Sequence, residues 1–313
     1  MNEVSKAVAI VTDPFRRFDF LASHGFLDGM SDEAFLRKKF RLMLGRELNL
    51  ETPSLFCDKL QWLKLYDRNP LYTQLADKYE VKQFVASKIG KEHIVPTYGV
   101  WRKFDEIDFA SLPDQFVLKC THDSGSFAIC KDKKTFDITN ARTVIEKGLS
   151  HNMFYRGREW VYKDIEPRII AEEYIPSLGK PESIEYKFTC FDGKVEMMTV
   201  CSGIAHVEYE KRFNDHFDRD RNRLPFYAYY KPSPEGLELP DNVDEIISVC
   251  ETLSAGIPQV RVDTYVVDGK IFFGEMTFYT WSGFIIFSDF DGKRNDKWDK
   301  WLGDKIKLPS KRT

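Results

Sequence analysis

Two carboxylates and a guanidinium interrupt an otherwise apolar and aromatic stretch at residues 261–278, "RVDTYVVDGKIFFGEMTF". The stretch alternates as a strand does and contains a typical two-residue turn at Asp268-Gly269, which predicts a β-hairpin. In that register, Asp263 lies opposite the Gly274-Glu275 step. Because neighbouring carboxylates repel each other, a cation is expected between them. It is either magnesium or the guanidinium of Arg261 in a structural ion pair, and the hairpin alone does not decide between the two.

A lysine and a loop of small residues form a second candidate site within "QFVLKCTHDSGSFAICKD". Lys119 ends a predicted strand, and Ser124, Gly125 and Ser126 lie in the loop that leads to the next strand. Such a loop brings backbone N–H groups close to phosphate oxygens, and the lysine adds a positive charge. Neither a P-loop motif nor G-x-G-x-x-G occurs in the chain. An ordinary hairpin turn with a solvated lysine remains the alternative.

An acidic strand end and a pair of lysines are weaker candidates. The predicted strand in "RIIAEEYI" runs into Glu172 and Glu173, followed by Ile175, and a segment leaving a sheet offers backbone groups to the edge of an adenine. The stretch "ADKYEVKQF" places Lys78 and Lys82 one helical turn apart, and therefore on the same face of a predicted helix. Taken alone, each feature also describes an ordinary solvated surface.

These residues need secondary structure to position them, and the hydrophobic pattern predicts which elements do so. The first 70 residues or so read as mainly helical, whereas the rest mixes short strands with single helices, which predicts an α+β fold with antiparallel sheets. Helices are predicted at 31–45, 54–67, 76–90, 138–150 and 242–256. Strands are predicted at 94–101, 115–120, 127–132, 168–175, 184–202 and 261–278, and a polar loop at 203–240.

Composition excludes several classes of protein. The 313 residues are 42% hydrophobic, enough for one large or two ordinary domains, and a net charge of −3 creates no basic field for nucleic acid. No apolar run approaches the roughly 18 residues of a membrane helix, and no signal peptide is recognisable. The six cysteines form no C-x-x-C pair, which favours reduced thiols in a cytoplasmic protein.

The order of these motifs along the chain resembles that of the ATP-grasp superfamily, and more specifically its TupA-like branch. That branch is associated with teichuronopeptide and other bacterial surface polysaccharide biosynthesis. The resemblance spans roughly residues 40–290 and is carried most specifically by "VRVDTYVVDGKIFFGEMTFYTWSG". It implies an ATP-grasp fold preceded by a helical N-terminal region at 1–75, with an N-terminal subdomain at 76–170 and a C-terminal subdomain at 171–313.

The resemblance also implies a set of residues that bind ATP. Two lysines and the loop of small residues would hold the phosphates, the acidic strand end would meet the adenine, and a later carboxylate and lysine would reach the ribose and the phosphates. These residues are Lys78, Lys119, Ser124, Gly125, Ser126, Glu172, Glu173, Ile175, Glu185 and Lys187.

The remaining implied roles concern the metal and the reaction. Asp263 and Glu275 match magnesium ligands, and Thr277 stands where an asparagine is usual. Arg261 and Lys119 would be the catalytic cations, since electrostatic stabilisation requires positive charge at the transferred group. Residues placed to meet the acceptor substrate are Ser282 and Gly283 in a small-residue turn and Arg212 in the polar loop.

The implied reaction is the formation of an amide by an ATP- and magnesium-dependent carboxylate–amine ligase through an acylphosphate. Its expected partners are small molecules or glycans, with an amino acid or amine joined to a hexuronic acid of a capsule or other surface polysaccharide. A sugar phosphotransferase is the first alternative, because it needs the same nucleotide site. A glycosyltransferase is the second, since Asp218-Arg219-Asp220 forms a D-x-D pattern, although a solvated charge cluster also explains it. The basic side chains of the 203–240 loop either bind an anionic sugar or pair with interleaved carboxylates.

Overall fold

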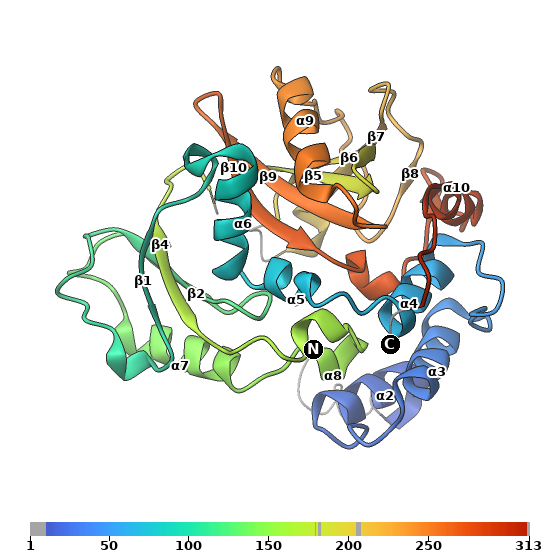
Figure 1. The fold of residues 1–313 in the computed structure, drawn as a ribbon, viewed down its shortest axis with the longest axis horizontal. Coiled ribbons are helices and arrows are strands. Elements are labelled where there is room, and N and C mark those ends of the chain that lie inside the picture. Colours follow the sequence, from blue (N-terminus) through green and yellow to red (C-terminus); the bar gives the residue numbers. More distant parts are fainter. Residues whose placement is uncertain (1–10, 179, 181–182, 205–207, 312–313) are drawn as a thin grey trace.

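Two antiparallel sheets form the frame of the protein, with helices packed around them (Figure 1). The computed structural model describes residues 11–178, 180, 183–204 and 208–311. One sheet has four strands and the other five, and a short two-stranded sheet lies beside them. This mixture confirms the predicted α+β class.

The N-terminal region is helical, as predicted. Helix α3 (Asp32–Leu44) begins at Ser31, whose side chain accepts a hydrogen bond from the Ala34 N–H, and it ends at Gly45, which adopts the left-handed conformation (φ 70°). The other helices of this region are α2 (Pro14–Ser23), α4 (Phe56–Tyr66), α5 (Leu71–Ala76) and α6 (Glu80–Ile89), followed by the short η1 (Lys91–His93).

The four-stranded sheet has the order β1-β4-β2-β3 and carries a small core of its own. Helix α7 (Ile138–Leu149) covers one of its faces through buried Ala141 and Ile145. Its strands are β1 (Thr97–Trp101), β2 (Phe116–Cys120), β3 (Phe127–Cys130) and β4 (Ile169–Glu173). The short η2 (Phe104–Glu106) contributes Phe104 to the same core, whereas α8 (Phe154–Gly157) and η3 (Trp160–Tyr162) pack with the N-terminal helices.

The five-stranded sheet has the order β10-β9-β5-β6-β7, and helix α9 (Val243–Ser254) packs on one face. The strands are β5 (Ile184–Phe191), β6 (Lys194–Ser202), β7 (Phe213–Asp218), β9 (Val260–Val267) and β10 (Lys270–Thr277). The remaining elements are η4 (Tyr209–Lys211), β8 (Phe226–Tyr227), η5 (Thr280–Gly283), β11 (Ser288–Asp289) and α10 (Lys297–Lys305).

The prediction of a polar loop at 203–240 was wrong in part, because β7 and β8 lie within it. The sequence of β7, "FNDHFD", is polar at four of its six positions, so its hydrophobic signal is weak. Pairing with β6 and an ion pair between buried Asp215 and exposed Arg223 stabilise it instead. Tertiary contacts therefore outweigh local propensity here.

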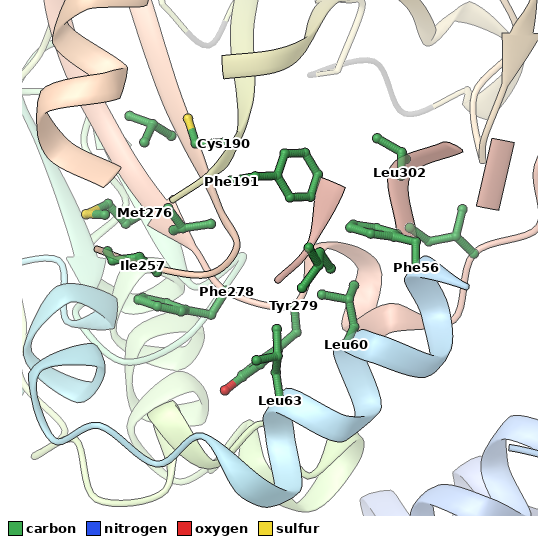
Figure 2. Packing of buried hydrophobic residues seen from close by; sticks show 14 of the residues in the cluster. Phe56, Leu60, Leu63, Cys190, Phe191, Ile257, Met276, Phe278, Tyr279 and Leu302 are labelled. Atoms are coloured by element: carbon green, nitrogen blue, oxygen red, sulfur yellow. The ribbon is translucent and has the colours of Figure 1, made fainter. Parts of the chain in front are cut away.

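The N-terminal helices and the five-stranded sheet share one hydrophobic core. Figure 2 shows Leu60 and Leu63 of α4 directed towards Phe278 and Tyr279, which follow β10. The ring of Phe56 on α4 packs edge-on against that of Phe191, with centroids 6.2 Å apart. The helices of the first 75 residues are thus packed against the C-terminal part of the chain. The predicted division into subdomains stays a prediction, and β4 lies across its boundary at residue 170.

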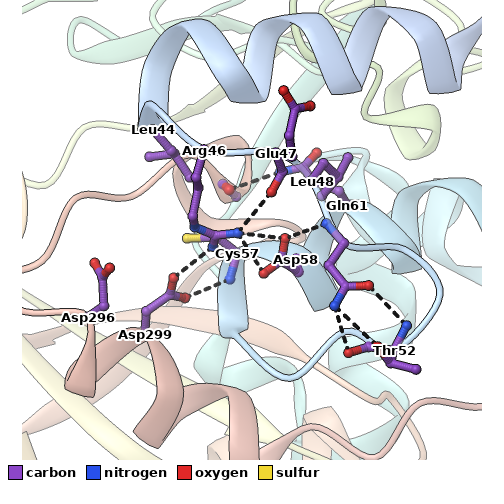
Figure 3. Close-up of polar contacts among 12 residues, drawn as sticks. Leu44, Arg46, Glu47, Leu48, Thr52, Cys57, Asp58, Gln61, Asp296 and Asp299 are labelled. Atoms are coloured by element: carbon purple, nitrogen blue, oxygen red, sulfur yellow. Dashed lines mark hydrogen bonds and ion pairs between the residues drawn. The ribbon is translucent and has the colours of Figure 1, made fainter.

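A buried ionic network joins α4 to the C-terminal helix α10 (Figure 3). The guanidinium of Arg46 donates to both carboxylate oxygens of Asp58 at 2.9 Å and to Asp299 at 3.2 Å. Asp299 also accepts from the backbone N–H of Cys57 at 2.8 Å. Both carboxylates are almost fully buried, so the arginine is what compensates their charge.

Replacing Arg46 with methionine should therefore destabilise the fold by about 3–5 kcal/mol, because two buried carboxylates lose their cation. Chemical denaturation would measure this. The matched control is Arg41→Met, whose exposed pair with Glu47 should contribute less than about 1 kcal/mol. Equal destabilisation by the two substitutions would contradict the assignment.

Candidate active site

A row of polar side chains crosses the five-stranded sheet on one face. The strand registers place Glu275 opposite Asp263, Asp263 opposite Lys187, Lys187 opposite Thr199, and Thr199 opposite His216. Directly paired residues point to the same face of a sheet, so these five side chains form one line, called here the polar row. Its β10–β9–β5 end is charged and its β6–β7 end is neutral.

Asp263 lies at the centre of the charged end and is only 4% exposed. Arg261 donates to its two oxygens at 2.5 and 2.7 Å, and Lys187 donates to one of them at 2.8 Å. Lys187 also binds Glu185 at 2.7 Å. Burial alone would raise the pKa of Asp263, but Arg261 and Lys187 together hold that pKa below its ordinary value. Asp263 is therefore ionised.

Glu275 completes the charged end. A bulge at Gly274 shifts the register by one residue, which brings Glu275 opposite Asp263 as the sequence predicted. Arg261 contacts Glu275 at 3.5 Å and the hydroxyl of Thr277 at 3.0 Å, while that hydroxyl donates to Glu275 at 3.0 Å. Arg261 thus bridges both carboxylates, and the ion pair considered as an alternative to the metal is formed in this structure.

The donor set of this end fits a hard cation. Asp263, Glu275 and Thr277 offer oxygen atoms alone, the ligand type that magnesium prefers. Among the described residues, no group of three or more His, Cys, Asp or Glu side chains is placed to hold a metal. Two carboxylates are the usual protein share of a magnesium site that is completed by substrate phosphates and water.

A second charged cluster is formed by Lys119 and Glu172 of the four-stranded sheet together with Lys82 of α6. Lys119 binds Glu172 at 2.8 Å, and Lys82 of α6 binds the other oxygen of the same carboxylate. Burial by itself raises the pKa of Glu172, yet these two lysines hold it below its ordinary value. Sequence reasoning assigned Glu172 to adenine and left Lys82 as a surface residue, so the lysine–glutamate–lysine cluster was missed.

Lys78 does not lie on the predicted helix face. It occupies the turn between α5 and α6, where its ammonium group donates to the backbone oxygen of Asp123 and its backbone N–H donates to Thr121 at 3.0 Å. Asp123 immediately precedes Ser124, so Lys78 is attached to the base of the loop of small residues. The structure therefore brings together two features that are 45 residues apart in the chain.

Two adjoining cavities contain nearly all of the predicted site residues. The first, of about 410 Å³, lies between the two large sheets. The second, of about 550 Å³, lies over the β5–β6–β7 part of the polar row. They share residues at their junction, including Lys78, Ser124, Lys187 and Glu275.

All ten predicted nucleotide-binding residues line the first cavity, together with Asp263 and Glu275. Arg261, Thr277 and Ser282 line the second. Gly283 and Arg212 are not among the described lining residues of either cavity, although the Arg212 guanidinium lies 3.3 Å from the hydroxyl of Tyr230, which does line the second.

Three of the basic residues at 203–240 are paired with carboxylates and do not add to the cationic surface that was considered. Arg219 pairs with Glu251, Arg221 with Asp244, and Arg223 with Asp215. Asp218, the first residue of the D-x-D pattern, accepts hydrogen bonds from Asn222 at 2.8–3.3 Å. These contacts favour the alternative of interleaved charges and give no support to a glycosyltransferase metal site.

The neutral end of the polar row was missed by sequence reasoning. His216 shares a hydrogen bond of 2.9 Å with Thr199, and its ring stacks on Phe226 with centroids 4.7 Å apart and planes within 9°. Burial lowers the pKa of the His216 imidazole to about 4, so the ring is uncharged at neutral pH. In "FNDHFD", Asn214 and His216 are two residues apart, so on a strand they point to the same face. Because the segment is mostly polar, it was predicted as a loop and this shared face was not recognised.

Helix α4 holds the turn at 279–283 in a strained conformation. Tyr279, Trp281 and Ser282 all have positive φ, between 51° and 55°, which is costly for residues with side chains. The ammonium group of Lys64 donates to the carbonyl and hydroxyl oxygens of Ser282 and to the carbonyl of Gly157, all within 2.7–2.8 Å. These bonds, made by a residue of the N-terminal helical region, place Ser282 in the wall of the second cavity.

Comparison with known proteins identifies the class to which this arrangement belongs. Two sheets that enclose a cavity lined with lysines and carboxylates characterise an ATP-grasp protein, and a scan against protein families agrees. Residues 58–307 match the family described as TupA-like ATPgrasp. The chain therefore belongs to the TupA-like ATP-grasp family, and the ligase class predicted from the sequence agrees with that membership.

Solved structures give more distant similarities. An ATP complex of D-alanine–D-alanine ligase from Bacillus anthracis is 18% identical, with a TM-score of 0.37. The match covers 66% of this chain, which spans 55% of that ligase. D-alanine–D-alanine ligase from Helicobacter pylori is 12% identical over 81% of this chain and 69% of its own, with a TM-score of 0.43. A search of curated proteins found no match.

The buried neutral His216 should make stability depend on pH. Its pKa is lower in the folded chain (about 4) than its ordinary value of 6.5, so the unfolded chain binds the proton first as the pH falls. The free energy of unfolding contains the full contribution of His216 above about pH 6.5, and it should fall by about 3 kcal/mol between pH 6.5 and pH 4. Denaturation of the His216→Phe variant should lack this component, and identical slopes in the two proteins would contradict it.

Removing the Lys64 ammonium group should destabilise the turn that it holds. Lys64→Met leaves the carbonyls of Gly157 and Ser282 without their donor, at an expected cost of about 1–3 kcal/mol in denaturation. Lys300→Met, at an exposed position of α10, should cost less than about 0.5 kcal/mol. If Lys64→Met lowers the free energy of unfolding by less than about 1 kcal/mol, the turn at 279–283 keeps its conformation without the Lys64 bonds.

Proposed function

We propose that the protein is an ATP- and magnesium-dependent carboxylate–amine ligase that forms an amide through an acylphosphate. The observation that carries the proposal is the first cavity. The residues assigned to ATP on sequence grounds come from both sheets, from the loop of small residues and from the turn before α6, and all of them line this cavity. Membership of the TupA-like ATP-grasp family supports the same assignment.

The charges of the first cavity suit a triphosphate. Lys78, Lys119 and Lys187 project into it from three separate parts of the chain, and the Ser124–Ser126 loop adds backbone N–H groups. At the other side, Glu173 ends β4 and Ile175 follows it, and both line the cavity where the strand leaves the sheet. We assign the phosphates to the lysine side and the base to the β4 side.

The reaction needs positioning and charge compensation more than a side-chain nucleophile. A carboxylate of the acceptor attacks the γ-phosphorus of ATP, and the bond to the β–γ bridging oxygen breaks to release ADP. An amine then attacks the acylphosphate carbonyl, the tetrahedral intermediate expels phosphate, and the amine loses a proton. Arg261 and Lys119 lie beside the two cavities and neutralise negative charge as it develops.

Magnesium would be held by Asp263 and Glu275, with the Thr277 hydroxyl beside them, and would neutralise phosphate charge. In its absence, Arg261 and Lys187 compensate Asp263, so no buried charge stands alone before the nucleotide arrives. With magnesium on the carboxylates, Arg261 and Lys187 would be free to contact the phosphates. The carboxylates at the charged end of the polar row would thus be compensated both without magnesium and with it.

The second cavity is the proposed acceptor site, because it opens onto the junction with the first cavity and includes Arg261. The association of the family with surface polysaccharides supports a hexuronic acid as the carboxylate and an amino acid or simple amine as the nucleophile. Ser282, which the Lys64 bonds place in the wall of this cavity, is assigned to acceptor binding.

Asp263→Asn and Glu275→Gln should each lower ADP formation at least about 100-fold, because the triphosphate loses its metal ligand while the side-chain shape is kept. A screen of uronic acids against amines with Mg·ATP would measure it. The control is Asp268→Asn, at the tip of the same hairpin, where the left-handed conformation (φ 50°) tolerates asparagine.

The product distinguishes the reactions in the same assay. An amide with release of phosphate supports the ligase, whereas a phosphate retained on the sugar would mean a phosphotransferase. Full activity in Asp263→Asn and Glu275→Gln would refute the metal assignment.

A further inference from the structure

The neutral end of the second cavity has hydrogen-bonding groups with no partner among the residues that the structure describes. His216 is 6% exposed and Asn214 is 5% exposed, and both line the cavity from β7. His216 Nε2 and Asn214 Oδ1 are buried, and neither has a hydrogen-bond partner within the described parts of the chain. Since an unpaired buried polar atom costs about 1–3 kcal/mol, these two atoms indicate a ligand that pairs with them.

The surroundings of these two atoms are uncharged. Of the described residues that line the second cavity, none on β6, β7 or β8 carries a charge, since His216 is neutral. The charged lining residues belong to other elements, and they are Lys78, Asp123, Glu159, Glu185, Lys187, Arg261 and Glu275. A charged group would be buried here without a counter-charge, which is strongly unfavourable.

Aromatic rings complete the neutral end. Phe226 lies against the imidazole of His216, and Trp281 stacks on Tyr229 with centroids 3.7 Å apart. Phe226, Tyr230, Trp281 and Phe287 all contribute to the cavity wall. Phe226 is stacked by His216 and Trp298, with centroids 4.7 and 4.6 Å away, so the apolar surface offered to a ligand comes from the other three rings. Apolar rings beside a few fixed hydrogen-bonding groups suit a ring that has C–H faces and hydroxyl edges, as a sugar has.

We propose that His216 and Asn214 bind the hydroxyl groups of an uncharged, polyhydroxylated ring, and that this ring carries its single carboxylate towards Arg261 at the charged end of the polar row. The assignment of the carboxylate end rests on the proposed function. The acceptor is then a uronic acid residue that is not linked to a nucleotide, because a diphosphate has no cationic partner on β6, β7 or β8 among the described lining residues.

The test compares two kinds of six-membered-ring carboxylate, with and without hydroxyl groups. D-glucuronate, D-galacturonate and D-mannuronate are titrated calorimetrically against cyclohexanecarboxylate, with the protein saturated with ADP and magnesium. At least one uronate should bind about 10-fold or more tightly than cyclohexanecarboxylate, since each neutral hydrogen bond contributes roughly 1 kcal/mol.

Two variants of similar shape remove the hydrogen-bonding groups. His216→Phe keeps the stack on Phe226, and Asn214→Leu keeps the side-chain volume, so each should fold and bind ADP as before. In both, the preference for the uronate should fall below about 3-fold, while cyclohexanecarboxylate binding stays constant. His151→Phe, at an exposed histidine outside the described lining of both cavities, should keep the full preference.

The inference is overturned if no uronate binds more tightly than cyclohexanecarboxylate, or if the preference survives in both variants. Tighter binding of a UDP-linked uronate than of the free sugar, lost in the same variants, also overturns it. Failure of the proposed function is seen separately, in the ADP-release assay. Absence of ADP release with every acid and amine, together with uronate binding that the variants weaken, would refute the ligase and leave the sugar site standing.

Discussion

The ionised state of one buried carboxylate, Asp263, governs the arrangement of the site. Burial disfavours its charge, so Arg261 and Lys187 must stand on either side of it. Those contacts accompany the pairing of β5 with β9. The bulge at Gly274 in β10 then places Glu275 opposite Asp263. Lys187 lines both cavities and Arg261 lines the second, so in the proposed reaction the interaction that satisfies the sheet would also supply positive charge for phosphoryl transfer.

The N-terminal helices shape the second cavity. Lys64 of α4 binds the strained turn at 279–283, and Phe56 of the same helix lines the cavity. Arg46 joins α4 to α10, so the helix that holds the turn is itself fixed at its outer side. Helix α4 thus contributes to the wall of the proposed acceptor site both directly and through the turn that it holds.

Local patterns predicted the helices and the hairpins, because caps such as Ser31 and turns such as Asp268-Gly269 act over a few residues. The facing of Asp263 and Glu275 followed from strand register alone. What local patterns missed depends on distant partners: β7 is stabilised by β6, and Lys82 reaches Glu172 across 90 residues of chain. The neutral state of His216 follows from its burial, which no single sequence reveals.

The most direct test of this account is a crystal structure with magnesium and a non-hydrolysable ATP analogue. We expect the triphosphate in the first cavity beside Lys78, Lys119 and Lys187, and the metal bound by Asp263 and Glu275. Such a result requires at least one of the present contacts of Asp263 with Arg261 or Lys187 to be exchanged for the metal. A nucleotide bound outside this cavity, or a bound nucleotide with both contacts unchanged and no metal at the carboxylates, would contradict the account.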